Sequence, residues 1–225
     1  MALHGTAFIA IWHDLAPGFE SEFERWHTEE HMPERLGVPG FLRGTRYMNW
    51  DQAPRVCFTL YELSHIEVFR SPGYLARLNA PTDWTHRVQP GMTNFLRGSC
   101  ETLVSLGQGI GGAVASARIT VDEAGSGDIT AKLAAVAFKV NALPGVTSTH
   151  LGRHAARFAG LATAESGLRP PAPESRFDYV LMFEGIDLET LERASTGVRH
   201  GLLDAGAREA EIGCYRLSYQ LRAPV

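Results

Sequence analysis

Several features that would assign this 225-residue sequence to a broad class are missing. No apolar run approaches the roughly 20 residues that span a bilayer, and the opening stretch MALHGTAFIAIWHDL has neither a basic leader nor a cleavage-site pattern. The formal net charge is only −4, and the lysines and arginines are spread along the chain. We therefore expect neither a membrane nor a nucleic acid as a partner.

Cysteine and serine nucleophiles also have little support. The three cysteines, Cys57, Cys100 and Cys214, are an odd number without metal-type spacing, and each lies in a strand-like run. We expect them to be reduced core residues of a cytoplasmic protein. The sequence has no Gly-x-Ser-x-Gly elbow and no histidine that pairs with a cysteine, which disfavours a nucleophile-based hydrolase.

The sequence does contain the same order of predicted elements twice. The first half predicts strand, helix, strand, strand, helix and strand at residues 6–15, 17–31, 40–49, 55–63, 74–88 and 94–106. Met32 precedes Pro33, so we expect the first helix to break there. The second half predicts the same order at residues 115–121, 128–142, 145–152, 177–185, 187–206 and 212–221. A Pro-Gly pair recurs at Gly40 and Gly145, and the correspondence indicates a duplication.

The β-α-β-β-α-β order predicts an α+β fold of two tandem ferredoxin-like halves. Each half leaves one sheet face uncovered, so we expect them to pack sheet to sheet as an intrachain α+β barrel. The predicted parts are residues 1–107, which carry the pocket, a glycine-rich linker at 108–112, and residues 113–225, a scaffold half with a mobile loop at about 155–175. The segment GQGIGG matches the dinucleotide pattern, but a predicted strand follows it where a helix is needed.

The motif HTEEH, residues 27–31, is the strongest chemical candidate. Its two histidines have the spacing of an inverted zincin motif, but catalytic zinc needs a third protein ligand, which no later helix clearly offers. Relative to the apolar stripe of Phe19, Phe23 and Trp26, Glu30 falls in the middle of the core-facing side. This placement favours a metal-free acid–base site. A zinc site and a structural or solvated cluster remain as alternatives.

Aromatic and imidazole side chains are concentrated in the first half. All four tryptophans and six of the nine histidines lie there, whereas the second half is richer in alanine and glycine. This asymmetry predicts one pocket per chain, in the first half. The predicted lining is Trp26, Glu30, His31 and Trp84. His13 and His86 are further candidates, and either Arg46 or Tyr47, which alternate along one strand, is expected to face the helices.

Three stretches of the chain together resemble a known group of proteins. They are FERWHTEEHMPERLGVPGFLRGTRY, YELSHIEVFRSPGYLARLNAPTDWTHRV and GQGIGGAVASARI. These stretches are similar to the dimeric α+β barrel superfamily, and within it to the EthD-like family in a tandem form that covers most of the chain. Similar proteins tend to carry tyrosine where this chain has His27. The matching positions are Glu30, His31, Pro33, Pro39, Gly40, Phe41, Arg46 and Tyr47.

The resemblance implies a ligand pocket between sheet and helices, with His31 projecting into it. Members of assigned activity are mostly cofactor-independent isomerases, cyclases, dehydratases and monooxygenases of cyclic or aromatic metabolites. A more distant branch binds haem through a histidine in its second half, where this chain has His200 on a predicted helix.

We expect a cofactor-independent, metal-free enzyme of the isomerase, lyase or cyclase type, acting on a cyclic or aromatic carbonyl metabolite. His31 abstracts a proton next to the carbonyl, Glu30 orients the imidazole, and Arg46 or Tyr47 stabilises the enolate. His27 adds a second acid–base group. The predicted substrate-binding residues are Trp26, Tyr47, Trp84, His86 and His13. The alternative is a non-catalytic or haem-binding module of the same fold, and a homodimer is left open.

Overall fold

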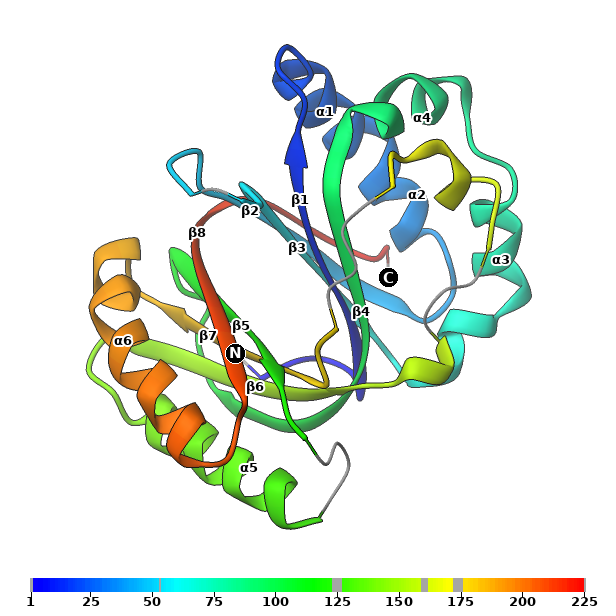
Figure 1. The fold of residues 1–225 in the computed structure, drawn as a ribbon. Coiled ribbons are helices and arrows are strands. Elements are labelled where there is room, and N and C mark those ends of the chain that lie inside the picture. Colours follow the sequence, from blue (N-terminus) through cyan, green and yellow to red (C-terminus); the bar gives the residue numbers. More distant parts are fainter. Residues whose placement is uncertain (1, 53, 123–126, 159–161, 172–175, 225) are drawn as a thin grey trace.

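The computed structural model describes residues 2–52, 54–122, 127–158, 162–171 and 176–224. Within these residues, eight antiparallel strands close into one barrel with helices on its outside (Figure 1). The strands are β1 (Ala7–Leu15), β2 (Phe41–Met48), β3 (Cys57–Leu63), β4 (Met92–Gly107), β5 (Ala113–Thr120), β6 (Val146–His154), β7 (Tyr179–Gly185) and β8 (Glu209–Arg222). The α-helices are α1 (Glu20–Trp26), α2 (Met32–Leu36), α3 (Pro72–Leu78), α4 (Asp83–Val88), α5 (Gly127–Asn141) and α6 (Leu188–Asp204).

The strands follow the order β1-β3-β2-β8-β5-β7-β6-β4, and β4 pairs with β1 to close the barrel. Two antiparallel ladders, β2–β8 and β4–β6, join the earlier strands to the later ones. The predicted mixed α+β class is therefore confirmed. Because the sheet closes on itself within one chain, a second copy is not needed to complete the barrel.

Side chains alternate between the inside and the outside of the barrel along each strand. Phe8 and Trp12 on β1 and Phe58 on β3 face inward, where they pack with Tyr215 from β8. The Trp12 indole N–H donates to Ser116 Oγ at 2.8 Å. The barrel interior is thus a packed core, and a ligand has to bind outside it.

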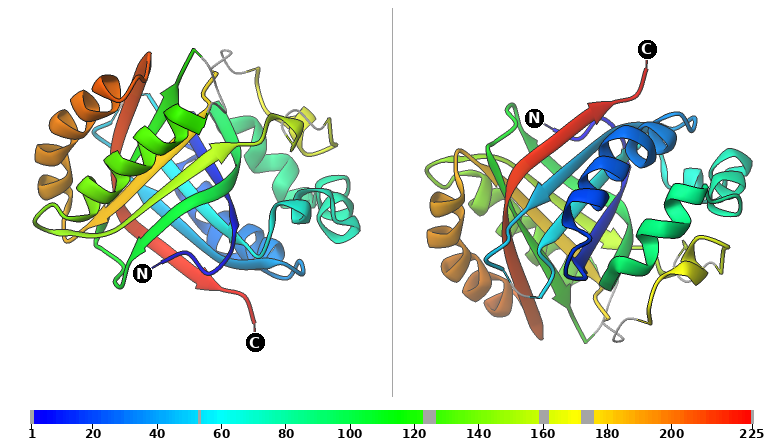
Figure 2. Two further views of the ribbon diagram at one scale, coloured as in Figure 1. Left: turned by 90° about the horizontal axis from the view of Figure 1, so that it is seen from below. Right: turned by 90° about the horizontal axis from the view of Figure 1, so that it is seen from above.

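The helices cover two opposite sides of the barrel (Figures 1 and 2). On one side, α1 to α4 lie over the early strands, and Ile9 and Tyr61 pack against Met32 and Leu36 of α2. On the other side, α5 and α6 pack on the later strands through an aliphatic cluster that includes Leu133. Each side therefore has its own apolar layer between helices and sheet.

Gly40 and Gly145 occupy matching turns in front of β2 and β6. Their φ angles are +98° and +81°, values that glycine adopts at little cost and other residues rarely adopt. A β-carbon on Gly40 would also lie 2.5 Å from Val68 Cγ2. The recurring Pro-Gly pair thus marks the same tight turn twice.

The first helical region continues through Pro33, so the predicted break at Met32 is wrong. Residues His27–His31 form a π-turn, in which the Met32 N–H donates to the His27 carbonyl five residues earlier. In a regular α-helix the Pro33 ring would clash with the carbonyl of the residue four positions before it. The wider turn relieves that clash, and α2 follows without interruption.

The glycine-rich segment before β5 packs against the barrel. The Gly111 N–H donates to Glu184 Oε2 at 3.1 Å, and a β-carbon on Gly111 would collide with the carbonyl oxygen of Gly185. Strand β5 follows the glycines directly. The segment therefore lacks the helix N-terminus that a dinucleotide-binding loop requires.

The predicted loop at about 155–175 crosses over to the helices of the other half. Its described part lies beside α2, α3 and α4 (Figure 1), where the Glu165 N–H donates to the Leu78 carbonyl at 2.9 Å. Phe158 and Glu165 are buried. Residues 159–161 and 172–175 of this predicted loop lie outside the described residues.

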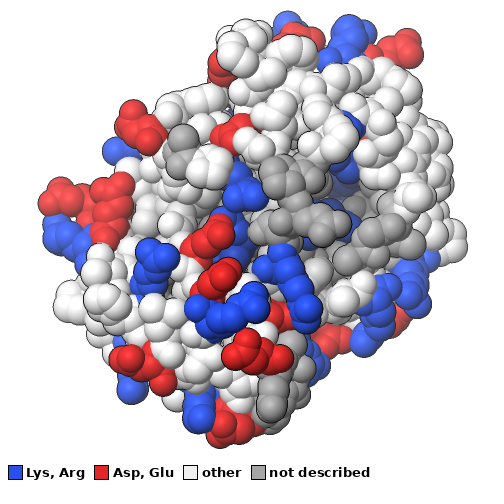
Figure 3. All heavy atoms as spheres, viewed as in Figure 1, with Lys and Arg blue, Asp and Glu red and all other residues white. Residues whose placement is uncertain are grey.

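Acidic and basic side chains lie next to one another on the face shown in Figure 3, and uncharged atoms cover most of the rest of that face. Among the described residues, no helix is both long enough and apolar enough to cross a membrane.

Candidate functional site

A cavity of about 70 Å³ lies outside the barrel, between the early strands and their helices. Residues from β1, β3 and β4 form its floor, and Thr163, Glu165, Ser166 and Arg169 from the crossing segment also line it. Its aromatic lining comprises Trp26, Phe41, Tyr61, Tyr74 and Phe95. The cavity is therefore built by both halves of the chain.

Strand alternation decides which floor residues reach the cavity. Ile9 on β1 lies opposite Tyr61 on β3, and Ile11 on β1 lies opposite Arg97 on β4. All four line the cavity, while the residues between them on β1 point into the barrel core. His13 continues the same outward face of β1 and also lines the cavity.

His31 presents a buried nitrogen without a partner. Its side chain is 8% exposed, and its Nδ1 has no hydrogen-bond partner among the described residues. The imidazole lies against the Trp26 indole, with 4.2 Å between the ring centroids. An unsatisfied buried polar atom costs about 1–3 kcal/mol, so this nitrogen marks a place where a ligand atom would be stabilising.

His27 connects two other side chains, and the contacts define its tautomer. Arg46 Nη1 lies 3.4 Å from His27 Nδ1, and Tyr61 Oη lies 3.3 Å from His27 Nε2. A guanidinium can only donate, so His27 Nδ1 accepts and the neutral ring carries its proton on Nε2. That proton is donated to Tyr61 Oη. The Tyr61 hydroxyl hydrogen is then available to an acceptor in the cavity, which Tyr61 lines.

His13 is held by its own backbone and by aromatic rings. Its Nδ1 lies 3.0 Å from the Asp14 carbonyl oxygen, which can only accept, so Nδ1 carries the proton. The imidazole lies 4.9 Å from Phe23 and 6.4 Å from Phe95, measured between ring centroids. In the neutral ring, Nε2 is therefore the acceptor.

All three histidines are neutral at pH 7. Burial lowers the pKa of His31 well below 6.5, and the charge of Arg35 lowers it further. Burial, followed by the charge of Arg46, lowers the pKa of His27 in the same way. Burial lowers the pKa of His13 to about 4, against the opposing effect of the Asp14 carbonyl. The cavity thus contains imidazoles in the form that can accept a proton.

We expect acid to destabilise the protein below pH 6.5. There the three histidines bind protons in the unfolded chain but stay neutral when folded, so the free energy of unfolding falls by up to about 1.4 kcal/mol per pH unit for each. Above pH 6.5 the three histidines are neutral in both the folded and the unfolded protein, so they cost no stability there. Below about pH 4 His13 is protonated in both states, and its effect on the free energy of unfolding stops growing. Urea unfolding at about pH 7.5 and about pH 5.5 measures the change.

His13→Asn should reduce the slope of the free energy of unfolding against pH by the amount that about one proton contributes, because it removes one of the buried imidazoles. The matched control is His86→Asn, since His86 is exposed on α4. Equal stability of the wild-type protein at the two pH values would contradict the neutral, buried state of these histidines.

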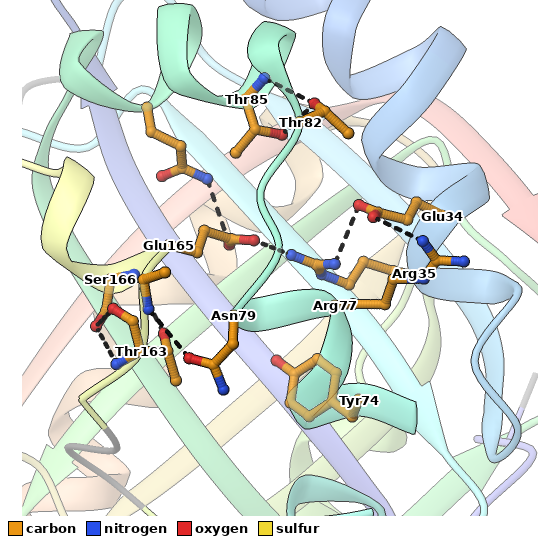
Figure 4. Close-up of polar contacts among 12 residues, drawn as sticks. Glu34, Arg35, Tyr74, Arg77, Asn79, Thr82, Thr85, Thr163, Glu165 and Ser166 are labelled. Atoms are coloured by element: carbon orange, nitrogen blue, oxygen red, sulfur yellow. Dashed lines mark hydrogen bonds and ion pairs between the residues drawn. The ribbon is translucent and has the colours of Figure 1, made fainter. Parts of the chain in front are cut away.

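Three arginines and one carboxylate also line the cavity. Arg35 of α2 forms an ion pair with Glu165, and Arg169 lies 3.6 Å from the same carboxylate. Arg169 also donates to Gln89 Oε1 at 2.8 Å. Figure 4 shows Glu165 pointing from the crossing segment toward Arg35. Ionic contacts therefore hold residues 163–169 over the cavity, and the third arginine, Arg97, comes from β4.

Three predicted site residues on the helices lie outside the cavity. Glu30 is half-buried and accepts a hydrogen bond from Thr82 Oγ1 at 2.6 Å, so it joins two helical segments and does not contact His31. The π-turn is the reason: it brings His31, five residues after Trp26, to the position that Glu30 would take in a regular α-helix. Trp84 donates to a surface glutamate, and His86 is exposed.

The two predicted residues on β2 also lie outside the cavity. Arg46 faces the helices, but it lies behind His27, where it donates to the Glu24 carbonyl at 3.3 Å. Tyr47 points into the barrel and donates to Glu184 Oε1 at 3.2 Å. The structure therefore brings His13, Trp26, His27 and His31 together in the cavity lining, and the other five predicted residues lie outside that lining.

Sequence reasoning missed several polar residues of the cavity, among them all of its arginines and its carboxylate. Arg35 follows His31 by four residues, a helical spacing that predicts a shared face. Tyr61 and Arg97 lie on outward positions of strands whose register follows only from the pairing. Glu165 and Arg169 lie in a segment without periodicity, so nothing in the sequence predicts that it crosses to the other half.

No cluster of three or more histidine, cysteine, aspartate or glutamate side chains that could hold a metal ion is found in the described part of the chain. His27 and His31 have no third ligand there. The geometry therefore offers no support for the zinc interpretation of HTEEH.

No protein-family model and no curated protein matches the sequence. Solved structures match it throughout. An "anthrone oxidase-like protein" has a TM-score of 0.65 at 11% identity, over 99% of this chain and 96% of that chain. A "putative monooxygenase" from Fusobacterium nucleatum has a TM-score of 0.60 at 10% identity, over 98% and 96%. A mutant chlorite dismutase from Candidatus Nitrospira defluvii has a TM-score of 0.57 at 11% identity, over 96% and 93%.

These proteins belong to the dimeric α+β barrel superfamily, and the chain has their fold. At identities of 10–11% the likeness extends to the fold alone.

The haem-binding alternative does not fit the described residues. His200 on α6 is exposed. The layer under α5 and α6 is filled by Leu133, Val140 and Leu191. The cavity on the other side, at about 70 Å³, is far smaller than a porphyrin. A groove of about 870 Å³ lies between α5 and α6, but no histidine is among the described residues that line it.

Proposed function

We propose that this protein is a small-molecule enzyme of the isomerase, lyase or cyclase type, which abstracts a proton next to the carbonyl of a cyclic or aromatic compound without a cofactor. The observation that carries the proposal is the buried, unpartnered Nδ1 of neutral His31 in a cavity walled by aromatic rings. The name of the anthrone oxidase-like neighbour agrees with this substrate class, because anthrone is a polycyclic aromatic ketone.

In the proposed reaction, neutral His31 takes the proton from the carbon next to the carbonyl. The electron pair of the broken C–H bond moves to the carbonyl oxygen and gives an enolate, which the Tyr61 hydroxyl stabilises by donating a hydrogen bond. Return of the proton to another carbon gives an isomer, and departure of a neighbouring group gives an elimination product. This step is common to the reaction types proposed.

His27 and Arg46 act behind Tyr61 as positioning residues in this proposal. Arg46 holds the proton of His27 on Nε2, and His27 in turn donates to Tyr61 Oη. Burial keeps the pKa of Tyr61 above its usual value, so the phenol remains a hydrogen-bond donor throughout the working pH range. Arg46 thus has a role different from direct contact with the enolate.

A ring-sized substrate requires the cavity to widen. Its volume of about 70 Å³ is small beside the roughly 300–1,000 Å³ of ordinary ligand pockets. Residues 163–169 are the part of the wall that is held mainly by side-chain contacts, through Glu165 and Arg169. We propose that this segment shifts when the substrate enters, consistent with the mobile loop expected near residues 155–175.

The experiment is proton exchange with 2-tetralone, a benzo-fused cyclic ketone with a benzylic α-carbon, in D₂O buffer followed by NMR. We expect the protein to accelerate loss of the α-proton signal over buffer, and Tyr61→Phe to lower the rate about 10²-fold, the effect of removing one oxyanion donor. The control is Tyr219→Phe, since Tyr219 is on β8 and does not line the cavity. Equal rates in Tyr61→Phe and the wild-type protein would refute the role of the hydroxyl.

We also propose that the barrel is the tandem, EthD-like form, with ferredoxin-like halves at residues 1–107 and 113–225. The strand orders β4-β1-β3-β2 and β8-β5-β7-β6 support this, because each is the same permutation of four consecutive strands. The matching turns at Gly40 and Gly145 support it as well. A reducing cytoplasm is the proposed compartment, since Cys57, Cys100 and Cys214 are all free and buried.

A further inference from the structure

The charges that line the cavity do not balance. Arg35, Arg97 and Arg169 are three guanidinium groups, which stay protonated at neutral pH, and Glu165 is the one carboxylate among the described lining residues. Glu34, outside the lining, pairs with Arg35 at 3.2 Å, so two carboxylates face three guanidinium groups. The three histidines of the cavity are neutral. An excess of positive charge in a small, largely buried space is costly unless an anion accompanies it.

We propose that the ligand of this cavity carries an anionic group, a carboxylate attached to a flat apolar body, and that Arg97 together with Arg169 binds it. This inference deepens the proposed function, on which it rests, by naming the substrate class: a cyclic or aromatic carbonyl compound that is also a carboxylic acid.

Arg97 is the least satisfied of the three arginines. It has no carboxylate within ion-pair distance among the described residues, and it donates a long hydrogen bond, 3.4 Å, from Nη2 to Tyr74 Oη. Its guanidinium lies 5.3 Å from the Phe69 ring centroid. The aromatic face stabilises the charge from one side and leaves the N–H groups at the edge free for an acceptor.

Arg169 comes from the crossing segment and packs in a similar way. Its guanidinium lies 4.0 Å from the Phe95 ring centroid, and its shared carboxylate, Glu165, is already paired with Arg35. The 3.6 Å between Arg169 and Glu165 is a distance for attraction without a strong hydrogen bond. Two planar, partly satisfied guanidiniums that line one cavity suit the two oxygens of one carboxylate.

The remaining lining explains the rest of the ligand. Phe41, Tyr61, Tyr74 and Phe95 offer flat apolar surfaces in the same lining as the arginines and the histidines. A ring therefore fills the middle, with its carboxylate toward Arg97 and its carbonyl toward Tyr61 and His31. The negative charge would also offset the arginines that lower the pKa of His31, and so make His31 a stronger base once the substrate is bound.

The test is a titration of the full-length protein with benzoate and with its neutral analogue benzamide at low ionic strength, by calorimetry and by NMR of the histidine imidazoles. We expect benzoate to bind at least about tenfold more tightly than benzamide and to shift the His31 signals. Arg97→Gln should reduce that preference to below about twofold, because a charge-assisted pair becomes a neutral contact. The matched control is Arg199→Gln, since Arg199 is exposed on α6.

Equal affinity for benzoate and benzamide, no saturable benzoate binding, or an unchanged preference in Arg97→Gln would each overturn the proposal. Should Arg97→Gln not fold, Arg97→Lys decides: a preference reduced at least about twofold supports the bidentate role of arginine, and the wild-type preference refutes it. Binding is measured without turnover, so His31→Gln should keep the benzoate preference. If the wild-type protein preferred benzoate but did not accelerate proton exchange with 2-tetralone, the proposed function would be refuted and this inference would stand.

Discussion

Replacing Arg43 by methionine is expected to lower the free energy of unfolding by about 3–5 kcal/mol, because the substitution leaves the Glu62 carboxylate buried without its cation. Arg43 is 2% exposed and Glu62 is fully buried, and they form an ion pair inside the barrel. The second oxygen of Glu62 accepts the His4 N–H at 2.8 Å. Domains of this kind are stable by roughly 5–15 kcal/mol, so the loss is a large part of the total. Urea unfolding at about pH 7.5 measures it.

Two comparisons make the Arg43 result specific. Adding Glu62→Gln to the Arg43→Met variant should recover part of the lost free energy of unfolding. The second substitution removes the buried charge but keeps an acceptor for the His4 backbone N–H. Arg193→Met, which breaks the exposed pair with Glu189, should cost less than about 1 kcal/mol. A cost for Arg43→Met no larger than that of Arg193→Met would show that the barrel interior is more hydrated than the structure indicates.

His31→Gln is expected to lower the rate of α-proton exchange by about 10²–10⁴-fold, because general-base catalysis contributes that much and glutamine cannot accept the proton. Glutamine keeps a polar group of similar size against Trp26, so the fold should persist. The measurement is the exchange of 2-tetralone in D₂O, with urea unfolding of the variant as a check on its stability.

His200→Gln is the matched control for His31→Gln. His200 is exposed on α6, on the opposite side of the barrel from the cavity, so its replacement should leave the exchange rate unchanged. A rate in His31→Gln within a few-fold of the wild type would rule out His31 as the base. A loss in both variants would point to a general effect on the protein and not to the imidazole.

Several features of the site followed from residue types and short-range spacing. His13, Trp26, His27 and His31 were predicted as site residues, and all four line one cavity. Buried imidazoles near aromatic rings favour a pocket because they combine apolar surface with one polar atom, and this chemistry is readable without coordinates. Their catalytic and binding roles remain predictions.

The orientation of Glu30 could not be predicted from spacing. Extrapolating a 3.6-residue period from Phe23 and Trp26 places Glu30 in the core, but one π-turn changes the period locally and puts His31 there. Trp12 and Trp50 show a related limit: one fills the barrel interior and the other is half exposed. A concentration of tryptophans in the first half therefore did not mean that all of them shared a pocket.

The sequence by itself determined the local structure of this protein: the strands and helices, the Pro-Gly turns at Gly40 and Gly145, the α+β class and the histidine cluster on the first helix. These depend on backbone preference and on side-chain periodicity, which act over a few residues. Only the tertiary structure decided that Tyr61 and Arg97 face the cavity and that Glu165 and Arg169 reach it from the other half. Strand register and the course of a non-periodic segment depend on contacts between residues far apart in the chain, such as Arg35 with Glu165, and local patterns carry no information about them.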